Sequence, residues 1–404
     1  MHFLDPNRVT EALKESVVEQ IRGHFPVVGR KRTLHLDGIR VEDRLDAGDF
    51  TSQKAAKARG RSWTIPIVAD MRLTDSVTGG TLEKATINLG GLPKMTQRYS
   101  FIVDGNEYQM SKLWRLRPGV YNQVGDDGEI RAHWNTGKGR TFRVGFDPGS
   151  RLFTFQQKGS KATPLYPVMK VLGVTDAELS DRWGDAILAS NKAKPYEPAV
   201  RKIHRMLTDE SAKSVEEAEE GIRTVMADTL LSPEVNRITL GRPYDRVTGP
   251  AMLDSSAKLL AIARGEARPD SRDSLMFKSL HGVEDFVADR IRKQRNSTLW
   301  KMWNNLDKPE RGIRDVVRPG MFRRPIQESF RKSDVTAANP QINPLEMISG
   351  QLATTILAGK EGGIKTEHQV TDEAKQIEPS HLGFLDALQT PESARAGITL
   401  YLTA

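Results

Sequence analysis

Apolar residues recur along this chain with two different periods, and the changes of period divide the sequence. Behind Asn7, a residue that can cap a helix, four apolar residues fall at helical spacing: Val9, Leu13, Val17 and Ile21. Residues 30–61 are basic and follow neither period, so we expect a loop there. From Trp63 apolar and polar residues alternate, which predicts half-buried strands.

Turn residues show how the predicted strands are connected. Asp104-Gly105 stands between Phe101-Ile-Val and Glu107-Tyr-Gln-Met, and a two-residue hairpin needs positive φ at both turn positions. Asp127-Gly128 and Asp147-Pro-Gly149 mark two further hairpins. We therefore predict largely antiparallel β structure over residues 60–157.

After Pro167 the pattern becomes helical. Thr175 can cap a helix, and Ser214-Val-Glu-Glu217 has the sequence of a capping box. Residues 359–363, Gly-Lys-Glu-Gly-Gly, predict a loop, and the tail beyond them is irregular. Further helices are predicted over residues 256–263, 282–294 and 345–357. The fold class is therefore expected to be α+β, with several domains.

The composition fits a polar globular protein and excludes several chemistries. The 404 residues suffice for two or three domains, with 38% hydrophobic and 28% charged residues. The chain has no cysteine, which excludes disulfides, thiolate metal sites and cysteine nucleophiles. No apolar run approaches the roughly 20 residues that span a bilayer, so we expect no membrane partner.

One basic segment accounts for the net charge of +8. Between Arg290 and Lys332 there are thirteen Lys/Arg and four Asp/Glu. The segment is either a solvated surface or a surface that binds a polyanion. Arginine forks fit phosphate and aromatic faces fit bases, which favours the polyanion. The residues concerned are Arg311, Arg314, Arg318, Arg323 and Arg324, with Trp300, Trp303 and Phe322 among them.

Short motifs follow one another in an informative order. They are Phe101-Ile-Val-Asp-Gly-Asn-Glu107, Ser111-Lys-Leu-Trp-Arg115, Pro325-Ile-Gln-Glu-Ser-Phe330, Asn343-Pro-Leu345, Pro379-Ser-His-Leu-Gly383 and Thr390-Pro-Glu392. Together they resemble the N-terminal half of the β subunit of bacterial-type multisubunit RNA polymerase. For example, the family has Phe-Ile-Ile-Asn-Gly-Thr-Glu at the first motif and Ser-Gln-Leu-His-Arg at the second.

The resemblance implies a division of the chain into four parts. Residues 1–160 would form an antiparallel, β-rich protrusion and residues 161–300 an α-rich lobe. Residues 301–340 would be a basic return segment of the protrusion. Residues 341–404 would form an irregular fork loop and a region like the rifamycin pocket, completed by a partner chain.

The chain also departs from the family pattern. Where the family has a basic His-Lys-Arg-Arg cluster, this sequence has Ser349-Gly-Gln-Leu-Ala-Thr-Thr355, and Ala337-Ala-Asn-Pro340 replaces polar residues upstream. A rifamycin pocket should not survive these changes, so we expect rifampicin resistance. Together with a chain that stops before the later β segments, they resemble the split polymerases of giant (jumbo) bacteriophages.

The resemblance also implies where chemistry and binding lie. In this family an aspartate triad on β′ holds the catalytic Mg²⁺, and its motif is absent here, so we expect no catalytic or metal-binding residue and no cofactor in this chain. Nucleic-acid contacts are implied for Lys360, Lys365, His368 and Arg395. Glu392 and His381 would lie near the templating region, although a structural role for His381 is the alternative.

We therefore expect a β fragment that lines the DNA/RNA channel of a DNA-directed RNA polymerase and supports strand separation. Its partners would be a C-terminal β fragment, β′ fragments, template DNA and RNA product. It would act in the cytoplasm of an infected bacterial host or be packaged in the virion. The alternative is a stand-alone basic DNA-binding or virion structural protein that keeps the fold without transcription.

Overall fold

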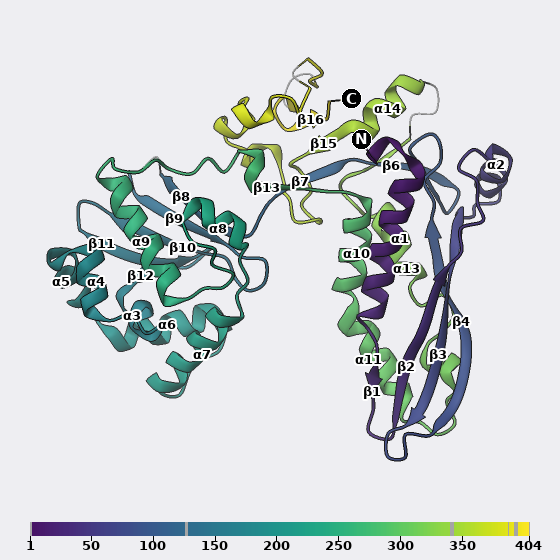
Figure 1. Ribbon diagram of the computed structural model, residues 1–404, viewed down its shortest axis with the longest axis horizontal. Helices are drawn as coiled ribbons and strands as arrows, with labels where there is room; N and C mark the ends of the chain where they lie inside the picture. The colour runs from purple at the N-terminus through teal and green to yellow at the C-terminus, as the bar shows by residue number, and fades with distance from the viewer. Residues whose placement is uncertain (1, 126–127, 340–342, 387, 392–394, 404) are drawn as a thin grey trace. The chain divides into compact units, whose positions relative to one another are not determined.

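The computed structural model describes residues 2–125, 128–339, 343–386, 388–391 and 395–403 (Figure 1). The chain forms two compact units. Unit 1 combines Met1–Arg115 with Leu280–Ala404, and unit 2 is Leu116–Ser279, so unit 2 is inserted into the sequence of unit 1. The resemblance predicted an α-rich lobe over residues 161–300, the part of the chain that overlaps most with unit 2. Unit 2 starts earlier because its first strands belong to the same sheet as the later ones.

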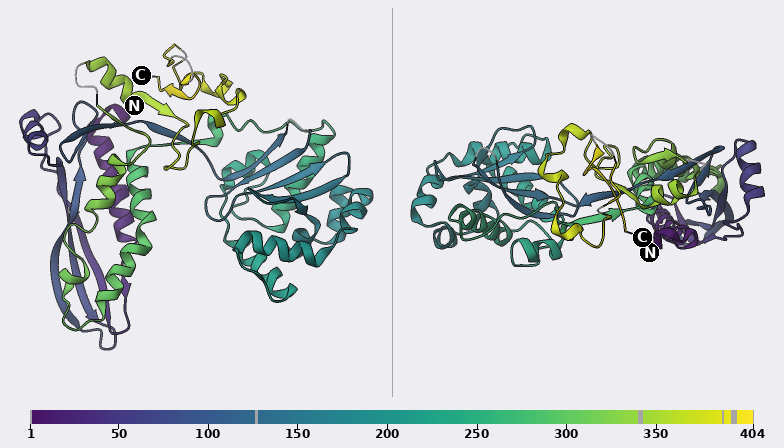
Figure 2. Two further views of the ribbon diagram at one scale, coloured as in Figure 1. Left: turned by 180° about the vertical axis from the view of Figure 1, so that it is seen from behind. Right: turned by 90° about the horizontal axis from the view of Figure 1, so that it is seen from above.

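Unit 1 is built on a four-stranded antiparallel sheet, and Figure 2 shows helices running alongside its strands. The alternating pattern after Trp63 is confirmed, since Ile65, Ile67, Ala69 and Met71 are all buried. The strands are β1 (Val27–Val28), β2 (Arg32–Val41), β3 (Thr64–Asp75) and β4 (Thr81–Pro93). The helices that contribute to the same core are α1 (Pro6–Arg22), α10 (Val283–Lys293), α11 (Arg295–Leu306), α12 (Ile313–Val316) and α13 (Arg323–Arg331).

The N-terminal helix has the predicted buried face but a different cap. Val9, Leu13, Val17 and Ile21 are buried, as their spacing predicted. The cap is Asp5, whose carboxylate accepts hydrogen bonds from the backbone N–H of Asn7 (3.0 Å) and of Arg8 (3.3 Å). The prediction of Asn7 as the cap was wrong because Pro6 already occupies the first turn.

The expectation of a loop over residues 30–61 was also wrong. This stretch contains β2 and the helix α2 (Phe50–Ala58), which Asp49 caps. In β2 the pairing with β3 shifts register between Leu36 and Gly38. Before this irregularity the apolar residues stand at even positions (Leu34, Leu36), and after it they stand at odd positions (Ile39, Val41). The two-residue period is therefore interrupted and cannot be recognised in the sequence.

Two smaller sheets complete unit 1. The hairpin at Asp104-Gly105 is confirmed, with φ of 48° and 80° at these residues. It joins β5 (Phe101–Val103) to β6 (Asn106–Met110), which also pairs with β14 (Thr336–Ala338). The helix predicted over 345–357 is shorter, because α14 (Pro344–Leu352) is followed directly by β15 (Ala353–Thr355). The remaining elements of this region are β7 (Lys112–Leu116), β16 (Thr399–Tyr401) and the short 3₁₀ turns η1 (His2–Leu4), η3 (Glu367–Gln369), η4 (Glu373–Lys375) and η5 (Pro379–His381).

Unit 2 packs helices against a five-stranded antiparallel sheet in the order β12-β11-β10-β9-β8. Its core is aromatic: Trp134 stacks on Phe142 (ring centroids 5.2 Å apart) and Phe153 on Trp183 (4.4 Å). The strands are β8 (Gly119–Val124), β9 (Ile130–Asn135), β10 (Phe142–Asp147), β11 (Leu152–Gln157) and β12 (Thr163–Pro164). The hairpin at Asp147-Pro-Gly149 is confirmed, whereas Asp127 lies outside the described residues.

The helices of unit 2 confirm the predicted caps in part. Thr175 forms a complete capping box with Glu178. Ser214 accepts from the backbone N–H of Glu217 (3.1 Å), but the Glu217 carboxylate accepts from the N–H of Lys213, one residue before the cap (2.6 Å). The helices are α3 (Tyr166–Val171), α4 (Asp176–Trp183), α5 (Asp185–Lys192), α6 (Tyr196–Thr208), α7 (Val215–Asp228), α8 (Pro233–Thr239) and α9 (Gly249–Ala263). The 3₁₀ turn η2 (Leu275–Phe277) and β13 (Lys278–His281) lead the chain back to unit 1.

Within the described ranges, no helix is both long and apolar enough to cross a membrane.

Candidate nucleic-acid interface

The C-terminal segment of unit 1, residues 343–386, 388–391 and 395–403, is attached to the rest of unit 1 by a small sheet. β15 pairs in parallel with β7 (Thr354 opposite Lys112) and antiparallel with β16 (Thr354 opposite Leu400). The Trp114 indole N–H donates to the Thr354 hydroxyl (3.1 Å), and the Gln109 side-chain amide donates to the carbonyl of Met347 (2.6 Å). Partners more than two hundred residues apart in sequence therefore hold this segment in place.

Lys112 is a further anchoring residue, and it is buried. Its ammonium donates to the carbonyl of Gln351 and lies 4.7 Å from the ring centroid of Phe3. The Gln351 side chain in turn donates to the Phe3 carbonyl (2.8 Å). Burial lowers the pKa of Lys112 to about 8. The contact joins the N-terminus, β7 and the end of α14.

The Gly-rich sequence after β15 was predicted as a loop, and backbone hydrogen bonds close it into a turn. The N–H of Gly363 donates to the carbonyl of Ala358 (2.7 Å), and the N–H of Ala358 to the carbonyl of Ile364 (3.1 Å). Gly362 has a φ of +88°, and a Cβ on Gly363 would lie 2.7 Å from the Ala358 nitrogen. Both positions therefore require glycine.

Arg115 holds this turn from β7. Its guanidinium donates to the backbone carbonyl of Glu361 and forms an ion pair with Asp289 (3.0 Å). It also lies 5.8 Å from the ring centroid of Phe286. Sequence analysis quoted Arg115 as part of a motif but gave it no role. The sequence signal that could have pointed to this role is the position of Arg115 at the end of the Ser-x-Leu-x-Arg motif.

Lys360, a predicted nucleic-acid contact, is engaged within the fold. Its ammonium lies 2.8 Å from a carboxylate oxygen of Asp334, and its backbone N–H donates to the other oxygen (3.1 Å). Asp334 raises the pKa of Lys360. The Glu361 carboxylate accepts from the N–H of Asp334 (3.2 Å). Lys360 therefore helps to fix the turn against the end of α13.

The other predicted residues of this region divide into exposed and buried ones. Lys365, His368 and Arg395 are exposed, and within the described ranges none of the three has an ion-pair partner. His381 is buried in η5, where its Nδ1 accepts from the N–H of Glu378 (3.4 Å). Glu392 lies outside the described residues.

The predicted arginines of the basic segment differ in their surroundings. Arg324 forms an ion pair with Glu328 (3.1 Å), which Lys332 also contacts (2.9 Å). Hydrogen bonds from Lys332 and Arg324 lower the pKa of Glu328 to about 2. Arg311 lies 3.9 Å from Asp315. The side chains that are exposed and have no ion pair in the described part of the chain are Arg314, Arg318 and Arg323.

The aromatic residues of the basic segment behave in two ways. Phe322 is 1% exposed and packs edge-to-face on His24 (centroids 5.2 Å apart), so its prediction as a base-stacking residue was wrong. Trp300 and Trp303 are 64% and 46% exposed. Helix periodicity explains the difference, because α11 buries Met302 and Leu306 on its inner face and leaves both tryptophans outside it.

The predicted binding residues thus form two groups. One group lies around α12 and the start of α13, and the other lies beside the Gly-rich turn. Asp334, which follows the end of α13, binds the turn through the N–H of Lys360. In unit 1, α11 and β15 lie toward opposite ends (Figure 1). The Gly-rich turn and its exposed neighbours are therefore one candidate interface and the basic segment another.

A buried carboxylate stands where the C-terminal segment begins. Glu107 is 1% exposed at its side chain and accepts hydrogen bonds from Arg98 (2.8 Å), Lys57 (2.7 Å), Ser100 (2.5 Å) and Asn339 (3.1 Å). Burial alone would raise its pKa, but the bonds from Arg98, Lys57 and Ser100 outweigh burial and lower the pKa to about 2.

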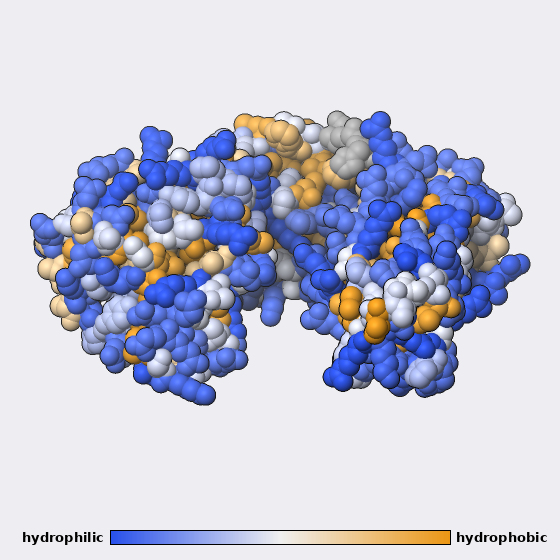
Figure 3. Space-filling view, turned by 60° about the horizontal axis from the view of Figure 1, so that its bottom comes forward, coloured by the Kyte–Doolittle hydropathy of each residue, from blue (hydrophilic) through white to orange (hydrophobic). Residues whose placement is uncertain are grey.

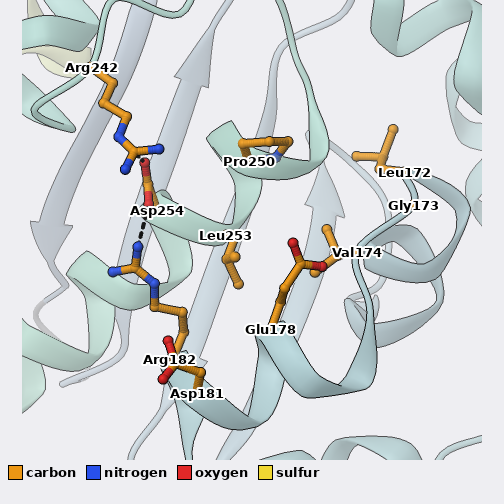
Figure 4. Close-up of a pocket in the computed structure, with 10 residues that line it drawn as sticks. All are labelled: Leu172, Gly173, Val174, Glu178, Asp181, Arg182, Arg242, Pro250, Leu253 and Asp254. Carbon is orange, nitrogen blue, oxygen red and sulfur yellow. Dashed lines mark ion pairs between the residues drawn. The ribbon is translucent and has the colours of Figure 1, made fainter.

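Unit 2 contains a separate pocket of about 380 Å³ (Figure 4). Asp254 lies there between Arg182 (3.5 Å) and Arg242 (3.7 Å) and accepts from the Tyr244 hydroxyl (2.6 Å). Its lining mixes both signs of charge with Leu253 and other apolar residues. The groups satisfy one another, which is typical of a structural network.

Among the residues that the structure describes, no three His, Asp or Glu side chains gather as ligands for a metal ion.

Comparisons with known proteins point to one family. The family model for RNA polymerase Rpb2, domain 3, matches residues 337–404. The chain is similar to the DNA-directed RNA polymerase subunit beta of Thermosynechococcus vestitus (22% identical over 417 residues) and of Gloeobacter violaceus (21% over 427 residues). Each alignment covers 96% of this chain and 36% of the relative. The chain thus spans little more than a third of the length of these relatives.

The chain is thus similar to RNA polymerase β subunits along nearly its whole length, in agreement with the motifs, which indicated the N-terminal part. The multi-domain α+β fold with several antiparallel sheets is consistent with that assignment.

Proposed function

We propose that this chain, which resembles an N-terminal portion of a bacterial-type β subunit along nearly its whole length, is a non-catalytic subunit of a multisubunit DNA-dependent RNA polymerase. The observation that carries the proposal is the domain-3 match over residues 337–404, because this segment contains the Gly-rich turn held by Arg115 and Asp334. Its proposed role is to line the DNA/RNA channel and to support separation of the DNA strands.

The exposed cations near the turn would contact the nucleic acid. Lys365, His368 and Arg395 are exposed and have no ion-pair partner among the described residues, so their donors remain available for phosphate oxygens. Lys360 would act differently from the other predicted contacts. Because Asp334 already neutralises it, Lys360 positions the turn and adds little to phosphate binding. Glu392 and His381 remain proposed neighbours of the templating region.

The chemistry would depend on partners. We assign the Mg²⁺-binding aspartates of nucleotidyl transfer to a β′ partner, which together with a C-terminal β segment would complete the enzyme on template DNA and RNA product. The proposed site of action is the cytoplasm of a bacterial host.

We further propose a split, rifampicin-resistant polymerase of a giant bacteriophage, packaged in the virion or made during infection. Its support lies in the departures upstream of β15. Ala337 and Ala338 offer only backbone groups in β14, and the Asn339 side chain is bound to Glu107. Polar side chains that could bind rifampicin are therefore replaced or already engaged there.

A native pull-down of the tagged chain would test the function. The eluate would be assayed for template-dependent incorporation of labelled ribonucleotides with rifampicin present. We expect rifampicin-resistant synthesis by an eluate that contains several co-purifying chains. An eluate with this chain alone, binding DNA but inactive in synthesis, would overturn the proposal and support the stand-alone DNA-binding alternative.

The same assay can test the role of the exposed cations. We expect Lys365→Glu with Arg395→Glu to lower synthesis on fully duplex DNA about tenfold, and less on DNA with a premelted bubble. Lys161→Glu, an exposed lysine of unit 2, is the matched charge control. Equal losses on both templates would contradict a role in strand separation.

A further inference from the structure

We propose that a groove beside α11 docks an acidic segment of a partner polypeptide, which inserts an apolar side chain next to Trp300. This inference uses the basic segment rather than the Gly-rich turn, and it does not depend on the polymerase assignment. The groove lies within unit 1 and has a volume of about 480 Å³. Its lining is Trp300, Lys301, Asn304, Asn305, Asp315, Val316, Arg318 and Met321.

The first argument is the exposure of large apolar side chains. Trp300 is 64% exposed and Trp303 46%, and Val28, on the strand β1 that packs against α11, is 63% exposed. Unit 1 does not need these side chains for its core, since α11 already buries Met302 and Leu306 completely. The end of unit 1 that comes forward in Figure 3 shows hydrophobic patches within a hydrophilic surface. Exposed apolar clusters of this kind mark interaction sites.

The second argument is the construction of the groove. Val316 is buried and Met321 half-buried, so aliphatic and thioether groups form its inner side, and Trp300 forms an exposed wall. Lys301 and Arg318 are exposed at its border. An apolar interior with tryptophan and arginine beside it is the composition of binding hot spots between proteins.

The third argument is the charge that remains after internal pairing. Asp307 accepts hydrogen bonds from the backbone N–H groups of three consecutive residues, Arg30 (2.8 Å), Lys31 (2.9 Å) and Arg32 (3.2 Å). Asp315 accepts from the N–H of Gly312 (3.1 Å), and Glu83 from the N–H of Ile313 (2.9 Å). These hydrogen bonds direct the carboxylates toward the backbone, although Asp315, which lines the groove and lies 3.9 Å from Arg311, keeps its charge.

The cations beside the groove are left without such partners. In the described part of the chain, Lys301 and Arg318 have no ion pair, although both are exposed. In the lining, Lys301 and Arg318 outnumber the carboxylate of Asp315, so the groove complements an acidic ligand.

The features of the groove favour a polypeptide over the other acidic or apolar occupants. A nucleic-acid strand needs successive aromatic platforms, but Phe322 is buried and Trp303 is not among the lining residues. In a two-fold symmetric dimer, a second copy of this chain would bring the same basic segment toward Lys301 and Arg318. An acidic segment with one apolar anchor satisfies both the charge and the apolar interior.

Photo-crosslinking in the natively purified complex would identify the occupant. A benzophenone amino acid would replace Asn305, which lines the groove, and Val124, an exposed residue of unit 2, as the control position. We expect the groove position alone to attach to a polypeptide segment with excess Asp and Glu and an apolar residue at the attachment point. Attachment to DNA or to a second copy of the chain, or no attachment at all, would overturn the proposal.

Substitutions then test the two parts of the recognition. We expect Trp300→Ala and Arg318→Glu each to raise the dissociation rate of the crosslinked partner about tenfold, and Arg318→Lys to retain most of the binding. Arg314→Glu, an exposed arginine that does not line the groove, is the matched control. High salt should reduce the effect of Arg318→Glu but not that of Trp300→Ala.

The unfolding midpoint of each variant should equal that of the parent chain, because both side chains are exposed. Equal weakening by Arg314→Glu and Arg318→Glu would contradict a defined groove, and an unchanged dissociation rate in Trp300→Ala would contradict the apolar anchor.

Discussion

Unit 2 and the C-terminal segment of unit 1 are stabilised in different ways. Unit 2 encloses a continuous core of its own, in which aromatic rings from the sheet stack on one another and on Trp183. The described residues of the C-terminal segment, 343–386, 388–391 and 395–403, bury few large apolar side chains, and polar contacts from distant residues hold them: Lys112, Gln109, Trp114, Arg115 and Asp334. The stability of unit 2 therefore comes from contacts within residues 116–279, whereas the position of the C-terminal segment depends on a few residues elsewhere in unit 1.

The largest effect should come from the core of unit 2. Trp183 is 1% exposed, stacks on Phe153 and donates its indole N–H to Ser256 (2.8 Å). We expect Trp183→Ala to lower the free energy of unfolding of unit 2 by about 3–5 kcal/mol, because it leaves a large cavity. Urea denaturation would measure this.

The matched control is Trp303→Ala, which removes the same side chain from an exposed position and should change stability by less than about 0.5 kcal/mol. Equal destabilisation by the two variants would show that burial does not distinguish these tryptophans.

A smaller effect should come from Glu107, which binds Asn339 where the C-terminal segment begins. Its pKa of about 2 lies below the ordinary value of 4.5, so the ionised carboxylate stabilises the fold fully above pH 4.5. This contribution, about 3 kcal/mol, should be lost as the pH falls through 4.5 toward 2. Urea denaturation of unit 1 between about pH 2 and about pH 7 would measure it, because this range brackets the transition.

In Glu107→Gln the pH dependence should become shallower by this contribution, with Glu328 supplying part of the remainder, and the variant should be less stable than the parent at neutral pH. Glu42→Gln, at an exposed glutamate paired with Arg44, is the control and should keep the parental pH dependence. A parental pH dependence in Glu107→Gln would assign the acid sensitivity to other groups.

The smallest effect at neutral pH should come from Lys112. Because burial lowers its pKa to about 8, below the ordinary 10.5, the unfolded chain binds a proton more readily than the folded chain between these values. The free energy of unfolding should therefore rise with pH from about 8 to about 10.5. Lys112→Met should lack this rise and lose about 1 kcal/mol near neutral pH through the missing bond to Gln351.

Urea denaturation between neutral and alkaline pH would measure the effect, with Lys84→Met, an exposed lysine of β4, as the control. A rise in stability that persists in Lys112→Met would show that another group titrates.

Local signals in the sequence predicted local structure well. The positive φ values at Asp104 and Gly105 and the helix cap at Thr175 depend on neighbouring residues only, and both were predicted. The irregular pairing of β2 after Leu36 broke the period that would have revealed a strand. Local patterns therefore fail where an element is held by register shifts or by residues far away in sequence.

The candidate interface shows the same limit. Motifs predicted the Gly-rich turn, but they could not show that Asp334 neutralises Lys360 or that Arg115 holds the Glu361 carbonyl. Nor could composition separate Phe322, which is buried, from Trp300, which is exposed. These distinctions depend on which side of a helix or loop faces the core, and only the assembled unit determines that.

The insertion of unit 2 into unit 1 has a consequence for synthesis on the ribosome. Residues 1–115 emerge first, but the helices α10, α12 and α13 that pack on α1 and the β2–β4 sheet emerge only after all of unit 2. We expect unit 2 to fold while the apolar face of the nascent sheet, including Ile65 and Ile67, still lacks its cover. The early half of unit 1 would then be the stage of biogenesis that most needs a chaperone.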